Sequence, residues 1–176
     1  RALDPRLDDV LAPEGLTPAI RALLARAGDA LDIAYPIDLR GLRATQLPQN
    51  APIVSMVSAV AASMGLTSVQ VFVSPQLGKS CLPCASNPPT LVVGDGLVSA
   101  TNDLSRAFLI VRSLKLVAAQ ASALVRLQPS ELGVLLNAFF MAYNPGWTPQ
   151  GVGPAALAEA SRRLAPGIRR AGDPEL

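Results

Sequence analysis

Apolar residues recur with a helical spacing in two segments of the N-terminal half, and proline and glycine mark where each helix begins and ends. Thr17-Pro18 is typical of a helix start, with a threonine cap followed by proline at the first helical position. This helix is predicted to end near Gly28. A second, more apolar helix is predicted over residues 51–66, where Gly65 stops it.

Strand patterns follow in the middle of the chain. Residues 69–74 alternate and are rich in valine, whereas residues 90–94 are almost all apolar and are expected to be buried on both faces. Residues 37–42 are predicted to form a short edge strand. The segment between the two main strands, residues 75–89, is predicted to be a turn-rich excursion.

Helical patterns return in the C-terminal half. A long helix is predicted over residues 103–127, and proline then breaks it. Ser130 is predicted to cap a helix that runs to Tyr143, and a last helix is predicted over residues 155–165. This order of elements predicts an α+β fold that is mainly helical, with a small β-sheet packed on a long, buried central helix.

The chain has 176 residues, which suits one domain with a sizeable core. Residues 16–165 are predicted to form this domain, with a linker over residues 1–15 and a polar tail over residues 166–176. Because the chain begins at Arg1 and not at methionine, we expect it to be a piece of a longer protein.

Composition narrows the classes of partner. Half of the residues are hydrophobic and only 16% are charged, so either the helices fill their core with small aliphatic residues or some apolar surface meets a protein partner. The net charge is +2 and the arginines are scattered, which argues against a nucleic-acid partner because phosphates require a concentrated basic surface. Polar residues interrupt the long apolar runs, so no membrane span is expected.

The chain contains no histidine. This absence excludes a Ser-His-Asp triad, a Cys-His dyad and every zinc site that uses histidine. We therefore expect no metal ion and no cofactor.

Cys81 and Cys84 form the one motif with reactive side chains, a Cys-x-x-Cys. It has three interpretations: a structural pair without chemistry, a local disulfide, or a redox or metal function. The two prolines that follow are not compatible with the helix of a thioredoxin-type redox pair, and a complete zinc site requires four ligands. The sequence favours the structural pair first and the disulfide second.

Two stretches share a layout with a known family: VSAVAASMGLTSVQVFVS, residues 57–74, and PPTLVVGDGLVSATNDLSRAFLIVRSLKLVAAQ, residues 88–120. A helix ending in Gly-Leu, two strands around a turn-rich segment, and an acid-capped helix resemble the core of gluzincin-type zinc metalloproteases. The closest type is the heat-shock and CAAX-processing peptidases. The layout also resembles peptidase-like domains at the end of bacterial tetratricopeptide-repeat proteins. The resemblance covers residues 52–128 and implies a zincin-like fold.

The family's catalytic motif, His-Glu-x-x-His, is not retained. The resemblance places Arg112 and Leu116 at the two histidine positions and Ser113 at the glutamate position. Arginine and leucine cannot bind a metal ion, and serine cannot replace the glutamate as a general base. The family's third ligand is a glutamate on a later helix, where this chain has Glu159. Glu159 is either a relic of that ligand or an exposed acid paired with an arginine of its own helix.

Arg112 also has two interpretations. Its side chain either extends out of the helix to water, with Lys115 on a neighbouring face, or fills the vacated metal position and pairs with Glu159 or Asp103.

The resemblance implies a catalytically inactive metalloprotease-like domain that binds a protein or peptide partner. An extended peptide would pair with an exposed edge at residues 90–94 or 69–74, and Phe140, Tyr143 and Trp147 would line the binding cleft. Two alternatives stay open: an architectural domain that forms a homodimer or caps a repeat protein, and thiol-based redox activity at Cys81 or Cys84.

Overall fold

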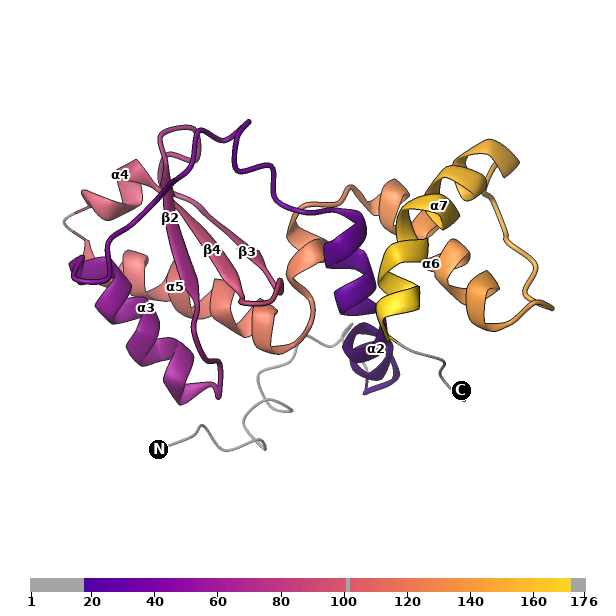
Figure 1. The fold of residues 1–176 in the computed structure, drawn as a ribbon, viewed down its shortest axis with the longest axis horizontal. Helices are drawn as coiled ribbons and strands as arrows, with labels where there is room; N and C mark the ends of the chain where they lie inside the picture. Colours follow the sequence, from indigo (N-terminus) through magenta and orange to yellow (C-terminus); the bar gives the residue numbers. More distant parts are fainter. Residues whose placement is uncertain (1–17, 101, 172–176) are drawn as a thin grey trace.

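The computed structural model describes residues 18–100 and 102–171. This part of the chain is an α+β fold of six α-helices, one short 3-10 helix (η1) and a four-stranded sheet (Figure 1), which confirms the predicted fold class. The helices are α2 (Pro18–Ala34), α3 (Pro52–Ser63), α4 (Asp95–Val98), α5 (Asp103–Ala118), η1 (Ser122–Val125), α6 (Pro129–Tyr143) and α7 (Pro154–Ala171). Among these helices, none has the length and hydropathy that crossing a membrane requires.

The strands lie in the order β1-β2-β4-β3. Their bounds are β1 (Thr45–Gln46), β2 (Gln70–Ser74), β3 (Cys81–Cys84) and β4 (Thr90–Gly94). β2 and β4 pair in parallel at the centre, and β1 and β3 flank them as antiparallel edge strands. β4 is buried along its whole length, as its apolar sequence predicts.

Two strand predictions were wrong. Residues 37–42 form turns in place of an edge strand, because Asp38 accepts the backbone N–H groups of Leu42 and Gly41 at 3.0 and 2.9 Å. The edge strand on this side is β1. The turn-rich segment, residues 75–89, contains β3, whose central Pro83 made a strand unexpected from the sequence.

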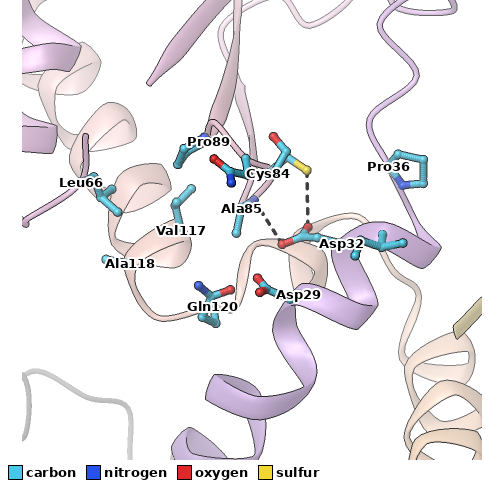
Figure 2. Close-up of a pocket in the computed structure, with 13 residues that line it drawn as sticks. Asp29, Asp32, Pro36, Leu66, Cys84, Ala85, Pro89, Val117, Ala118 and Gln120 are labelled. Carbon is cyan, nitrogen blue, oxygen red and sulfur yellow. Dashed lines mark hydrogen bonds between the residues drawn. The ribbon is translucent and has the colours of Figure 1, made fainter. Parts of the chain in front are cut away.

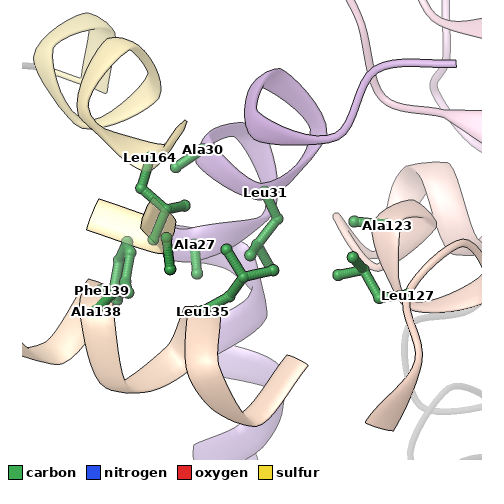
Figure 3. Close-up of a cluster of buried hydrophobic side chains, with 10 residues drawn as sticks. Ala27, Ala30, Leu31, Ala123, Leu127, Leu135, Ala138, Phe139 and Leu164 are labelled. Carbon is green, nitrogen blue, oxygen red and sulfur yellow. The ribbon is translucent and has the colours of Figure 1, made fainter. Parts of the chain in front are cut away.

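Two hydrophobic clusters organise the fold, and Figure 1 shows the sheet half, with α3, α4 and α5, beside the helical half, with α2, α6 and α7. In the sheet half, β2 and β4 pack against α3, α4 and α5. In the helical half, α2, α6, α7 and η1 pack around Leu31, Leu135, Phe139 and Leu164, and Figure 3 shows their side chains converging.

α5 ends earlier than predicted. Its last turn closes with Gln120 in the left-handed region at φ +55°, and the Ala121 N–H bonds to the Leu116 carbonyl at 2.8 Å. The chain then forms η1, so the predicted helix over residues 103–127 is two elements. α3 ends in the same way at Gly65, whose φ is +75°, and this stop was correctly predicted.

α2 continues through Gly28 to Ala34, so the prediction that Gly28 ends the helix was wrong. Glycine is required here because a Cβ would lie 2.2 Å from the Gln120 carbonyl oxygen. Gly28 therefore allows α2 to contact the end of α5.

The last two helices also differ from their predicted bounds. α6 begins at Pro129 after Gln128, whose N–H donates to Glu131 Oε2 at 2.9 Å, so Ser130 is not the cap. α7 continues past residue 165, because Leu164 is buried and Gly167 lies against Ala30 of α2. The predicted polar tail is therefore helical up to Ala171. The predicted linker, residues 1–15, the capping residue Thr17 and the last five residues lie outside the described residues.

Candidate functional site

A buried polar cluster joins the two halves of the fold. It comprises Asp32 of α2, Cys84 at the end of β3, and Ser122 and Arg126 of the η1 segment, and we call it the Asp32 cluster. Asp32 is 4% exposed and Ser122 is fully buried. A buried carboxylate is destabilising unless it is paired and hydrogen-bonded, so its partners determine what the cluster can do.

Asp32 accepts four hydrogen bonds, two from the end of β3 in the sheet half and two from the η1 segment. Oδ2 accepts from the Ala85 N–H at 3.1 Å and from the Ser122 hydroxyl. Oδ1 accepts from Arg126 Nη2 and from the Cys84 thiol at 3.6 Å, and Figure 2 shows the contacts with Cys84 and Ala85. The carboxylate is thus engaged by surrounding donors, and its geometry is that of a structural clamp and not of a free general base.

Arg126 extends the clamp to the backbone. Nη2 also donates to the Tyr35 carbonyl oxygen at 2.9 Å, and Nη1 donates to the Pro83 carbonyl oxygen. One arginine side chain therefore holds the end of α2, the edge strand β3 and η1 together. In the sequence, Asp32 and Arg126 each stand as one charged residue inside an apolar run. This pattern could have identified both residues, which were not among the predicted site residues.

A cleft of about 560 Å³ opens beside the Asp32 cluster. Figure 2 shows α2, the end of β3 and the end of α5 around it. Its ionisable lining groups are Asp29, Asp32 and Cys84. Asp32 is engaged in the clamp and Asp29 is exposed, so the Cys84 thiol is the buried lining group whose reactivity remains to be considered.

The two cysteines are free, so the local disulfide, which was the second interpretation of this motif, is not formed. Side chains three positions apart on a strand point to opposite faces of the sheet. Burial is the main cause that raises the pKa of Cys81 from its ordinary value of 9.0 to about 11, although a hydrogen bond with Ser113 opposes this shift. Burial, and then the charge of Asp32, also raise the pKa of Cys84. Protonated thiols are poor nucleophiles and poor metal ligands, so this geometry supports the structural pair.

The rate of thiol alkylation measures the reactivity of the two cysteines directly. Because the folded pKa of Cys81 is raised, its thiolate fraction at about pH 8 is expected to be about 100-fold below that of an ordinary thiol. Iodoacetamide labelling of the native protein, followed by mass spectrometry, should still accelerate with pH above about pH 10. In the denatured chain, as control, the labelling rate should be half-maximal at about pH 9 and level above about pH 10. Rapid native labelling that levels by about pH 8 would contradict the structural interpretation and support a redox thiol.

The three positions of α5 that the resemblance aligns with the histidines and glutamate of His-Glu-x-x-His have different environments. Arg112 is exposed, Leu116 is half-buried, and Ser113 is buried and hydrogen-bonds with Cys81. Asp103 pairs with Arg106, not with Arg112. The interpretation in which Arg112 fills a vacated metal position was therefore wrong, and its side chain extends to water.

Glu159 pairs with two arginines of its own helix, Arg162 and Arg163, the latter at 2.8 Å. α7 packs on α2 and α6, whereas α5 packs on α3, β3 and η1, so the structure does not bring Glu159 to the motif positions of α5. Within residues 18–100 and 102–171, no group of three or more histidine, cysteine, aspartate or glutamate side chains is arranged to hold a metal ion.

The predicted aromatic lining lies on α6 and the following loop. The rings of Phe140 and Trp147 are 4.9 Å apart, and those of Phe139 and Tyr143 are 4.8 Å apart. Trp147 donates to Asn137 Oδ1 at 3.0 Å. The structure brings these aromatic residues together, but the cleft is lined by other elements.

The predicted peptide-binding edges are not free. β4 lies between β2 and β3, and β2 lies between β1 and β4. At one of the two edge strands, β3, Pro83 has no N–H to donate, and its carbonyl oxygen accepts a hydrogen bond from Arg126. The expectation that residues 90–94 or 69–74 accept an extended peptide was therefore wrong.

Comparisons with protein-family models, with curated proteins and with solved structures find no match to this chain. What the protein does is therefore inferred from its own residues and geometry.

Proposed function

We propose that the chain is a catalytically inactive, metalloprotease-like domain that binds another protein through the solvent face of α5. One observation carries this proposal. Leu104, Phe108 and Val111 are 84%, 65% and 40% exposed, and their spacing of four and three positions places them on one side of the helix. We call this surface the α5 stripe.

The α5 stripe differs from scattered apolar surface residues. Single exposed apolar side chains are common, but a contiguous patch of large ones on a monomer is typical of a protein-protein contact. Burying a large side chain of this kind stabilises a complex by about 1.5–3 kcal/mol before the losses of association. A partner that covers all three residues would gain enough to bind.

The absence of catalysis is supported by the chemistry of the residues at the motif positions. Arg112 and Leu116 offer no metal-binding lone pair, and Ser113 is buried against the sheet. The layout of α3, β2, β4 and α5 follows the order that the metalloprotease resemblance implies. A family core that has lost its metal ligands and exposes an apolar helix face is suited to binding.

Capture of partners tests this proposal. A Leu104→Ser, Phe108→Ser variant is expected to lose at least about 90% of the partner recovered by the native protein, because the centre of the interface is removed. Met141→Ser is the matched control, since Met141 is 37% exposed but lies on α6. Equal recovery by all three proteins would refute a docking role for the α5 stripe.

A further inference from the structure

α5 has two apolar faces with different environments. Ile110 and Leu114 are buried against the sheet half, and the α5 stripe lies on the solvent side. A shallow hollow of about 440 Å³, lined by Leu104, Ser105, Phe108 and Leu109, adjoins the stripe. A hollow of this size can accept one large side chain of a partner.

Among the described residues of α5, the charged side chains that follow the stripe are both cations. Arg112 and Lys115 follow Val111 within about one turn on the same side of the helix. Asp103 lies about 100° around the helix from Leu104 and already pairs with Arg106. The exposed face of α5 is therefore apolar in its first three turns and cationic towards its C-terminal end.

We propose that the occupant of the α5 stripe is an acidic amphipathic helix of a partner protein. Its apolar side chains cover Leu104, Phe108 and Val111, and its carboxylates lie against the exposed guanidinium of Arg112. This is the helix-in-groove mode, in which anchors recur three and four positions apart, and opposite charges fix the orientation. The inference rests on the proposed function and names the chemistry of the partner.

A second copy of this chain fits the surface less well. It would present the same apolar residues and the same two cations, and the acid of its own α5 is paired within the helix. Like charges brought together at an interface disfavour association. A partner that supplies carboxylates has no such penalty.

A pair of designed peptides tests the inference on the full chain. One fluorescent peptide of about 18 residues carries leucines on one face and glutamates on the other, and its counterpart has lysine at every glutamate. Anisotropy is expected to show at least about tenfold tighter binding of the acidic peptide, and Phe108→Ser should weaken it by at least about tenfold. Arg112→Glu should weaken the acidic peptide and strengthen the basic one, a gain that a misfolded variant would not show.

Three results of the peptide experiment would overturn the inference. They are equal binding of the two peptides, binding of neither, and no change in preference with Arg112→Glu. Sedimentation of the native protein as a dimer that Phe108→Ser converts to a monomer would identify a second copy as the occupant. That result would also overturn the inference, but it would leave the α5 stripe as a protein-binding surface.

Discussion

Replacing Asp32 with alanine is expected to lower the free energy of unfolding by about 3–5 kcal/mol, because it leaves Arg126 buried without its countercharge. The substitution also removes the acceptor of the Ser122 hydroxyl and one of the two acceptors of the Ala85 N–H. Since these contacts join α2 to β3 and η1, the loss acts on the junction of the two halves. Equilibrium unfolding in urea at neutral pH measures the change.

A paired substitution separates the ion pair from the rest of the clamp. Asp32→Leu together with Arg126→Met is expected to recover part of the loss, because a matched apolar pair leaves no buried charge. Arg112→Ala is the surface control, expected to change the free energy of unfolding by less than about 0.5 kcal/mol. A similar, small effect of Asp32→Ala would contradict the buried clamp.

Replacing Gly28 with alanine is expected to destabilise the protein by about 1–3 kcal/mol. Alanine is normally better than glycine inside a helix by about 0.5–1 kcal/mol. At Gly28, however, the new Cβ would lie 2.2 Å from the carbonyl oxygen of Gln120. The backbone of α5's last turn would have to move, which opposes the gain in helix propensity.

Gly133 is the matched control for this prediction. It also lies inside a helix, α6, and nothing lies within 4 Å of the position its Cβ would take. Gly133→Ala is therefore expected to stabilise the protein by about 0.5–1 kcal/mol. Thermal unfolding of the two variants should show changes of opposite sign, and two stabilised variants would show that α2 does not pack closely on the end of α5.

Patterns within a short segment correctly predicted the elements that such patterns determine. The apolar run of β4 predicted a fully buried strand, and Gly65 predicted the end of α3 because glycine adopts a positive φ without strain. Gln120 closes α5 in the same conformation, but glutamine gives no such signal in a sequence. The predicted α5 was therefore too long.

The candidate site depends on contacts that a local pattern cannot show. Asp32 and Arg126 are 94 residues apart in the chain, and neither segment contains a pattern that predicts their pairing. The orientation of α5 was hidden for a different reason. Phe108 and Leu114 are both apolar, so periodicity could not show that Leu114 is buried and Phe108 is exposed.

Photo-cross-linking in cells that produce the protein would show whether another protein docks on the α5 stripe. A photoreactive phenylalanine analogue would replace Phe108 in one variant and Met141 in the control. If the α5 stripe is a docking surface, position 108 should give a discrete adduct with another protein, and position 141 should give none of the same mass. The absence of an adduct at position 108, or the same adducts from both positions, would contradict this role.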